Sequence, residues 1–455
     1  MPHPCKVLLV STYELGHQPL GLASPAAWLR RDGFEVSFRD TAIHALRESD
    51  YRDVEIAAFH VPMHTATRLA ISLLKRLRAS GSTARVVFYG LYAPVNRDYL
   101  RALGVDAVIG GEYEAALLAY CRAVRDGKNG EMPPPISLER LDFLVPDRRG
   151  LPPLERYARL CVPGGEERIT GYTEASRGCR HQCRHCPVVP VYGGKFRILP
   201  REIIMADIRQ QVEAGARHIT FGDPDFLNGP GHAIPLVETL HREFPALSYD
   251  VTIKVEHLLK HQRYLAVLKD SGCALITSAV ESLDDRLLGI FNKNHSVADF
   301  HQAVDLCDAH QLPLNPTFVA FTPWTTLEGY RDLLKNLAEL NLIDSISPVQ
   351  LAIRLLIPEG SHLLRLPETQ AVIGPFEPEL LGYPWRHPDL RMDQLCQNLM
   401  GIIPPASEAG KSRRDIFEAV WEKTNQVSGE ERPLPKPRRG PSRTEVPYLN
   451  EPWYC

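Results

Sequence analysis

The 455-residue sequence contains no long hydrophobic run and no strong excess of charge of either sign. The apolar stretch near its N-terminus, Val7 to Val10, is shorter than the core of a signal peptide, and no segment approaches the length of a membrane-spanning helix. With 52 basic and 55 acidic side chains, the formal net charge of −3 indicates no surface for a polyanion. We therefore expect a cytoplasmic protein that has neither a membrane nor a nucleic-acid partner.

Cysteine is also too sparse to suggest a disulfide-stabilised scaffold, because ten cysteines are spread over a chain that is long enough to bury a large core. Without a secretory signal, reduced thiols are the better expectation. A composition of 44% hydrophobic and 24% charged residues is typical of a folded protein, here of two or three domains.

The first part of the chain, residues 1–127, alternates short apolar runs with helical patterns. This alternation predicts a doubly wound parallel sheet with helices on both faces. Ligands of such sheets lie at the carboxyl ends of the strands, so the loops that follow the strands are expected to converge on one site. The expected strands are 6–11, 36–38, 56–61, 86–89 and 107–109, and the converging loops are 14–21, 62–65, 90–94 and 110–112.

Residues 128–168 are rich in proline and predict a linker between domains with some ordered turns. Strand and helix patterns then alternate again over 169–360, which predicts a partial or complete α/β barrel of the TIM type. A helical region, 361–425, and an extended tail, 426–455, complete the expected organisation. The six expected barrel strands are 169–176, 218–222, 248–255, 274–281, 314–321 and 347–354.

The most informative motif is Cys179-Arg-His-Gln-Cys183-Arg-His-Cys186, in the loop after the first expected barrel strand. Three thiolates at these spacings can each hold one iron of a [4Fe–4S] cluster, and the fourth iron is then left free to bind a substrate or cofactor. The alternative is a structural zinc ion, with His181 or His185 completing the ligand set.

This CxxxCxxC loop resembles that of the radical S-adenosylmethionine (SAM) superfamily. The resemblance implies that Cys179, Cys183 and Cys186 hold the cluster and that the free iron is chelated by the amino and carboxylate groups of SAM. Electron transfer from the cluster then cleaves the sulfonium and yields a 5′-deoxyadenosyl radical. His185 stands where the family usually has an aromatic residue beside the adenine, so we expect it to stack there.

Two further segments resemble SAM-binding motifs of the same superfamily. The sequence FGDPDF at 221–226 occupies the place of the glycine-rich motif after the second strand, which makes Gly222 and Asp223 candidate SAM contacts. Gly222 is the better candidate, because a close approach of the backbone to a ligand tolerates no side chain.

The second segment, AVESLD at 279–284, resembles the "ES…D…L…K" pattern after the fourth strand and implies SAM contacts from Glu281 and Ser282. A zwitterionic cofactor in a dry cavity also needs a cation, for which Arg354 and Lys254 are candidates. For each charged residue the alternative is a salt bridge that lines the barrel mouth.

The N-terminal sheet resembles the cobalamin (B12)-binding-like domain that precedes many radical SAM barrels. The matching features are Pro19–Gly21, the strand end at 88–90 and the sequence VDAVIGGE at 105–112. The Asp-x-His-x-x-Gly motif, which supplies an axial histidine to cobalt, is missing. Relatives without it either bind the corrinoid without a histidine or have lost cobalamin, so both alternatives are open.

The last residue, Cys455, follows Asn450-Glu-Pro-Trp-Tyr454. This ending resembles a radical SAM subgroup whose tail carries Cys-Cys or Cys-selenocysteine before Ala-Glu-Pro. One hypothesis is that a selenocysteine codon has been read as a stop, and the other is an ordinary frayed terminus.

The sequence thus favours an enzyme that cleaves SAM reductively at a [4Fe–4S] cluster. With cobalamin, methylation of an unreactive carbon is the natural reaction, and without it hydrogen abstraction, rearrangement or peptide modification remain open. The expected partners are a small-molecule or peptide substrate and an electron donor such as flavodoxin or ferredoxin. The competing interpretation is a zinc- or iron–sulfur-stabilised binding module without turnover.

Overall fold

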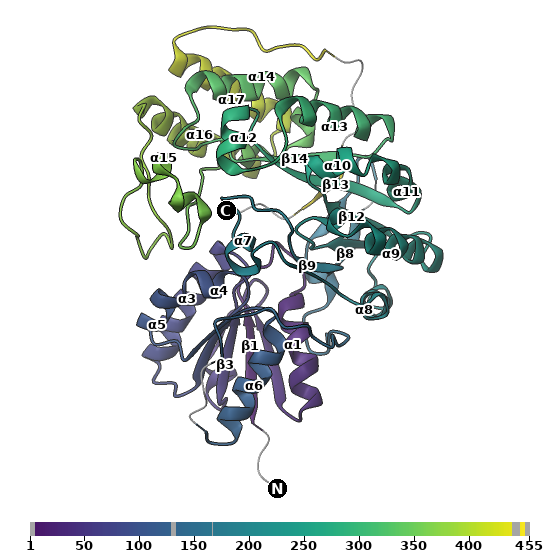
Figure 1. The fold of residues 1–455 in the computed structure, drawn as a ribbon, viewed down its shortest axis with the longest axis vertical. Coiled ribbons are helices and arrows are strands. Elements are labelled where there is room, and N and C mark those ends of the chain that lie inside the picture. Colours follow the sequence, from purple (N-terminus) through teal and green to yellow (C-terminus); the bar gives the residue numbers. More distant parts are fainter. Residues whose placement is uncertain (1–4, 129–132, 166, 439–445, 451–455) are drawn as a thin grey trace.

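The structure is a computed structural model that describes residues 5–128, 133–165, 167–438 and 446–450 (Figure 1). It contains two main sheets, one in the N-terminal third of the chain and one in the rest. Within the described residues no helix combines the length and the hydrophobicity that crossing a membrane requires. The expectation about Cys455 falls outside the described residues.

The N-terminal sheet is entirely parallel, with the strand order β2-β1-β3-β4-β5-β6. This is the doubly wound arrangement that the sequence predicts, and its strand order reverses between β1 and β3. The strands are β1 (Lys6–Ser11), β2 (Glu35–Asp40), β3 (Ile56–His60), β4 (Arg85–Tyr89), β5 (Ala107–Gly111) and β6 (Ile136–Ser137).

Helices cover both faces of this sheet, so its central strands are apolar on both sides. On one face Leu9 and Ala58 pack with α1 (Leu20–Arg31) and α6 (Tyr113–Arg125). On the other face, strand residues of the opposite parity pack with α3 (His64–Ala79) and α5 (Arg97–Ala102). The short helices α2 (Glu48–Tyr51) and α4 (Tyr92–Val95) lie in the connections.

The second sheet has the order β14-β13-β12-β11-β8-β7-β15 and forms an open, partial barrel. Five parallel strands make up its body, and two short antiparallel strands extend its edge. The parallel strands are β8 (Glu167–Thr173), β11 (His218–Phe221), β12 (Ser248–Thr252), β13 (Cys273–Glu281) and β14 (Leu314–Phe318), and the edge strands are β7 (Arg159–Cys161) and β15 (Tyr448–Leu449).

Helices pack around this sheet and bury the largest apolar core of the protein. Five of them match the helical patterns of the sequence between the barrel strands, which confirms the expected α/β architecture. The helices are α8 (Arg201–Glu213), α9 (Pro230–Glu243), α10 (Val255–Lys260), α11 (Leu265–Asp270), α12 (Asp285–Phe291), α13 (Val297–Ala309) and α14 (Leu327–Glu339), followed by α15 (Pro367–Gln370), α16 (Leu390–Glu408) and α17 (Arg413–Ser428).

The prediction of a sixth barrel strand at 347–354 is wrong. The chain forms a 3₁₀ turn at Pro348–Leu351 instead, and a single bridge between Phe321 and Arg354 is what remains of a ladder. The cause is local, because proline has no N–H to donate and the side chain of Gln350 accepts the hydrogen bond of the Phe318 N–H on the neighbouring strand. The Gln350 side chain thus accepts a hydrogen bond from β14 that the backbone of a sixth strand would otherwise accept.

The proline-rich segment between the sheets is more ordered than a flexible linker. Its strand β6 extends the N-terminal sheet, and its strand β7 extends the barrel sheet. Between them, the buried Arg148 guanidinium donates to both carboxylate oxygens of Asp207 on α8, at 2.8 and 2.9 Å. The segment therefore binds the two sheets to each other.

Candidate functional site

The loop with the three clustered cysteines lies between β9 (Ser176–Gly178) and β10 (Phe196–Ile198), which pair as an antiparallel hairpin. Helix α7 (Val188–Tyr192) follows the last of the three cysteines. Gly178, directly before Cys179, has a φ of 74°, and a Cβ there would lie 2.4 Å from the Tyr192 ring and 2.5 Å from the Lys195 carbonyl oxygen. Only glycine fits at this entrance to the loop.

Cys179 and Cys183 are buried, Cys186 is half-buried, and all three thiols are free. Burial raises the pKa of Cys186 to about 12, and the neighbouring Cys183 and Cys179 add to the effect. A cationic cluster would favour the thiolate form, which burial alone disfavours.

The two histidines of the loop do not complete a ligand set with these thiols. The His181 Nε2 atom faces Asp225 at 3.1 Å, and the His185 Nε2 atom faces Glu281 at 3.1 Å. With both imidazoles committed to carboxylates, the residues fit a cluster held by three thiolates, and zinc in a mixed thiol–histidine site lacks support.

Glu281 lies at the carboxyl end of β13, where the register to β14 shifts. Its φ of 71° is unusual for a residue other than glycine, and a conformation of this kind persists only where the surroundings enforce it. Its Oε1 atom contacts His185 and lies 3.4 Å from the Lys293 ammonium. Burial alone would raise the pKa of Glu281, but Lys293 and His185 outweigh it and lower the pKa to about 2.

Asp223 is buried after β11 and accepts hydrogen bonds from the Ala175 N–H and the Ser176 hydroxyl. Burial raises its pKa to about 7, against the opposing effect of these hydrogen bonds. Its partner in the sequence motif, Gly222, lines the cavity described below and is also crowded by protein: a Cβ there would lie 1.9 Å from the Tyr172 hydroxyl oxygen. Gly222 is therefore required by the packing of Tyr172.

The remaining two residues of the sequence prediction lie apart from each other. Ser282 is buried beside Glu281 and its hydroxyl accepts from the Asp284 N–H. The Arg354 guanidinium stacks 3.5 Å from the Trp385 ring centre, donates to the Trp385 carbonyl and pairs with Asp393. Arg354 thus anchors the C-terminal helical region, and it does not line the cavity described next.

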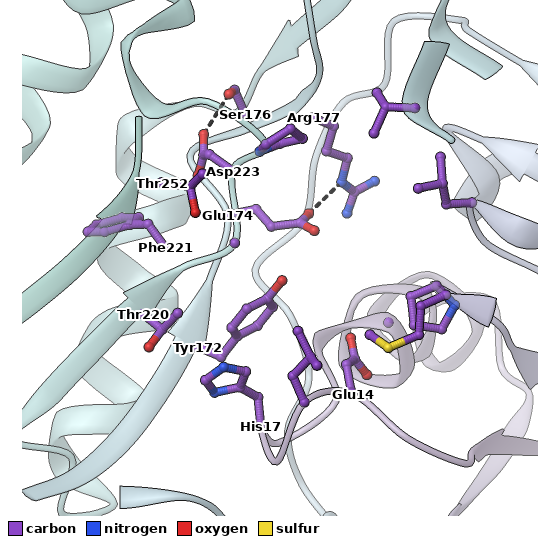
Figure 2. A pocket seen from close by; sticks show the side chains of 18 of the residues that line it. Glu14, His17, Tyr172, Glu174, Ser176, Arg177, Thr220, Phe221, Asp223 and Thr252 are labelled. Carbon is purple, nitrogen blue, oxygen red and sulfur yellow. Dashed lines mark hydrogen bonds and ion pairs between the residues drawn. The ribbon is translucent and has the colours of Figure 1, made fainter. Parts of the chain in front are cut away.

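A cavity of about 370 Å³ lies where the carboxyl edges of the two sheets meet (Figure 2). The N-terminal sheet contributes the loops after β1, β3, β4 and β5, including its topological switch point, so the predicted convergence of these loops is confirmed. The barrel contributes side chains from β8, β11, β12 and β13. Among the lining residues are Leu15, Met63, Leu91 and Val188, and Gly222 and Asp223 of the sequence prediction.

Three polar side chains of the N-terminal sheet at this cavity were not among the predicted site residues, although the sequence places the loop 14–21 at the site. Glu14 and His17 follow β1, and His60 ends β3. His17 stacks on Tyr172 with ring centres 4.7 Å apart, and burial lowers its pKa to about 4. The Glu14 Oε2 and His60 Nδ1 atoms, 3.6 Å apart, are both buried without a hydrogen bond among the described residues. The signal available was a polar residue directly after an apolar strand.

A second polar group links the two sheets beside the cysteine loop. The Arg177 guanidinium donates to Glu174 at 2.8 Å and to Glu114 at 3.0 Å, and Glu112 lies 3.4 Å from it. Figure 2 shows the Arg177–Glu174 contact at the cavity wall. Burial raises the pKa of Glu112 to about 7, because the nearby Arg177 offsets only part of the effect.

Comparison with known proteins agrees with this layout. Residues 173–340 match the family model described as the Radical SAM superfamily, so the barrel is a radical SAM domain. Hopanoid C-3 methylase of Methylococcus capsulatus is 25% identical over 346 residues, which cover 71% of this chain and 64% of that protein. Hopanoid C-2 methylase of Rhodopseudomonas palustris is 23% identical over 133 residues. The chain thus spans less than two thirds of the length of either relative.

Two solved structures share the fold at low sequence identity. The radical SAM methyltransferase TsrM from Kitasatospora setae, solved with tryptophan and a SAM analogue, gives a TM-score of 0.60 at 18% identity, covering 74% of this chain and 71% of its own. The cobalamin-dependent radical SAM enzyme OxsB, solved with aqua-cobalamin and SAM, gives 0.64 at 12% identity, covering 88% and 66%.

Proposed function

We propose that this protein is a radical SAM enzyme that transfers a methyl group to an unreactive carbon, with a [4Fe–4S] cluster on Cys179, Cys183 and Cys186 and cobalamin in the cavity between the sheets. The observation that carries the proposal is a loop with three free thiols, whose two histidines face carboxylates instead, at the edge where the two sheets enclose one cavity. Its relatives by sequence and by fold include methylases and cobalamin-dependent enzymes.

When bound, the cluster and cobalamin supply electron transfer to the sulfonium of SAM and a methyl group for transfer. The protein's part is to bind and orient. Because His185 directly precedes Cys186, we assign its ring to stacking on the adenine of SAM. The Glu281 carboxylate contacts the Nε2 atom of this ring and orients it. The carboxylate of Glu281 stays ionised because Lys293 faces it, so it can accept hydrogen bonds from a ribose or ammonium group.

The cavity residues fit a corrinoid by their chemistry. Leu15, Met63 and Leu91 offer apolar surface to a flat macrocycle. The buried Glu14 Oε2 and His60 Nδ1 atoms have no hydrogen-bond partner among the described residues, so amide groups at the rim of the macrocycle can satisfy them.

We propose a small molecule or a peptide as the substrate of this radical SAM domain. The reaction also needs an external reductant, and flavodoxin or ferredoxin is the proposed donor.

Anaerobic purification and reconstitution test the proposal. We expect about four iron atoms per chain, broad visible absorption, bound corrinoid, and release of 5′-deoxyadenosine or S-adenosylhomocysteine on reduction with SAM present. The Cys183→Ala variant should lose iron and both products, whereas Cys273→Ala, a buried thiol on β13, should keep them. A wild-type protein without iron, or one with iron but no SAM turnover, would overturn the proposal.

A further inference from the structure

A second group of metal-binding side chains lies next to the cysteine loop, outside the cavity. His181, Asp225 and His257 offer one ligand atom each, all within 4.8 Å of one another. The exposed fractions are 9% for His181, 0% for Asp225 and 6% for His257. They come from three separate segments: the cysteine loop, the loop after β11 and helix α10.

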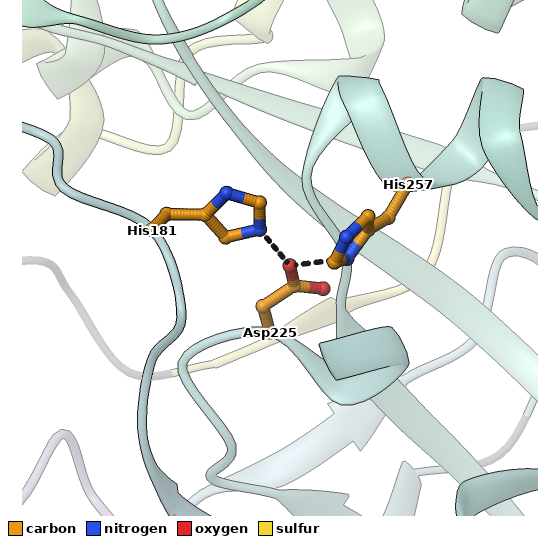
Figure 3. A group of neighbouring side chains, drawn as sticks. All are labelled: His181, Asp225 and His257. Carbon is orange, nitrogen blue, oxygen red and sulfur yellow. Dashed lines mark hydrogen bonds and ion pairs between the residues drawn. The ribbon is translucent and has the colours of Figure 1, made fainter. Parts of the chain in front are cut away.

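The geometry of this group is that of a ligand set. The His181 Nε2 atom lies 3.1 Å and the His257 Nδ1 atom 2.7 Å from the same oxygen, Asp225 Oδ2, and both rings point at it (Figure 3). Ligand atoms about 2.0–2.1 Å from a tetrahedral zinc ion stand roughly 3.3 Å apart, so the His181–Asp225 separation matches, and the shorter His257–Asp225 separation would open slightly around the ion. The other carboxylate oxygen, Oδ1, accepts from the Leu227 N–H and fixes the orientation of Asp225.

The surroundings of the two rings also suit a cation. The His181 Nε2 atom faces Asp225 at 3.1 Å and its Nδ1 atom faces Glu256 at 3.5 Å, so a carboxylate lies opposite each ring nitrogen. The His257 Nδ1 atom is buried 2.7 Å from Oδ2 but makes no directed hydrogen bond. With a metal, His181 donates only to Glu256, and two nitrogen lone pairs face the ion. Lys254, 3.5 Å from Glu256, balances that outer carboxylate.

We propose that His181, Asp225 and His257 bind a zinc ion, with Glu256 as the outer carboxylate that orients His181. A site with three protein ligands keeps a fourth position for water. The ion would tie the cysteine loop to the loop after β11 and to α10. Asn228, three residues after Asp225, already contacts the Cys179 sulfur at 3.6 Å, so the same loop would support the thiols from two points. The site does not depend on the proposed reaction.

The test must distinguish zinc in this site from zinc bound to the three cysteines when they carry no cluster. Full-length protein is purified anaerobically with its cluster intact, given one equivalent of zinc, desalted, and analysed for metals and by zinc K-edge X-ray absorption. We expect about one zinc per chain beside the iron, with nitrogen and oxygen ligands at about 2.0–2.1 Å and no sulfur at about 2.3 Å. If the cluster cannot be formed, the Cys179→Ser, Cys183→Ser, Cys186→Ser triple variant serves the same measurement.

Variants then assign the ligands. His257→Ala and Asp225→Asn should lose the zinc, and Glu256→Gln should weaken its affinity about 10- to 100-fold. His261→Gln is the matched control, because the ring of this histidine lies beside that of His257, with centres 5.2 Å apart, but is not one of the three grouped ligands. Sulfur in the zinc shell, no zinc in the wild-type protein, or equal zinc in all variants would overturn the site. If a variant does not fold, the zinc K-edge spectrum of the wild-type protein still shows whether the zinc has nitrogen and oxygen ligands or sulfur ligands.

Discussion

The Arg177 Nη1 atom lies 2.8 Å from Glu114 Oε1, in a buried ion pair that joins the strand before the cysteine loop to helix α6 of the N-terminal sheet. The Arg177 side chain is 7% exposed and that of Glu114 is 0% exposed. Glu112 and Glu174 share the same guanidinium, so one cation serves three carboxylates. The alignment of the two sheets at the cavity therefore depends on this arginine.

Removing that cation should destabilise the protein strongly. The Arg177→Ala variant leaves the buried carboxylates of Glu112 and Glu114 with hydroxyl donors but without a counter-charge, and we expect it to cost about 3–5 kcal/mol of unfolding free energy. Urea unfolding followed by circular dichroism measures the cost. The control is Arg180→Ala, an exposed arginine of the cysteine loop that stacks on Phe196 and should change stability by less than about 1 kcal/mol. Equal effects of the two variants would contradict the role of Arg177.

Glu112 should make stability depend on pH. Its folded pKa of about 7 exceeds the ordinary value of 4.5, so between these values the folded state binds more protons than the unfolded state. Its contribution to stability therefore falls as pH rises from 4.5 to 7, by up to roughly 1.4 kcal/mol per pH unit. The Glu112→Gln variant lacks this loss, so relative to wild type it should gain stability between pH 5 and pH 8 in urea unfolding. A pH-independent difference between the two proteins would refute the assignment.

Glu281 and Arg354 should behave differently although the sequence nominates both as SAM contacts. Glu281→Gln removes a charged hydrogen-bond acceptor beside His185, so SAM affinity should fall roughly 10- to 100-fold in equilibrium dialysis. Arg354→Gln should leave SAM affinity unchanged, because its guanidinium is engaged by Asp393 and Trp385, and should lower the unfolding free energy by about 1.5–3 kcal/mol. A loss of SAM affinity in Arg354→Gln would restore it as a cofactor contact.

Gly21 and His60 should be coupled energetically. A Cβ on Gly21 would lie 2.0–2.4 Å from the His60 ring, so Gly21→Ala should destabilise the protein by about 1–3 kcal/mol. In a His60→Ala background the ring is gone, and the same substitution should cost little. A double-mutant cycle of urea unfolding measures this coupling, and additive effects would show that the two side chains do not compete for space.

Much of the fold was predictable from the sequence, because its strands are buried on both faces and read as short apolar runs between helical patterns. The absence of a strand at 347–354 was not predictable. There the Gln350 side chain accepts a hydrogen bond that a strand backbone would otherwise accept, and nothing in the hydrophobic pattern signals this. The three cysteines were recognisable because their spacing is local.

The surroundings of the site were less predictable, because they depend on residues far apart in the chain. His181 could be noted as a metal ligand, but its partners lie 44 residues away, at Asp225, and farther still, at His257. Gly222 was predicted to allow the approach of a ligand, but the further need for a glycine there, which is to make room for the hydroxyl of Tyr172 on a neighbouring strand, could not be predicted from the local motif.

The connection between the two sheets also bears on how such proteins diversify. Because β6 belongs to one sheet and β7 to the other, a recombination breakpoint between residues 149 and 158 would leave each strand with its own sheet. It would, however, part Arg148 from the Asp207 carboxylate that it evolved with. The two halves with their connection should therefore be inherited as a single cassette.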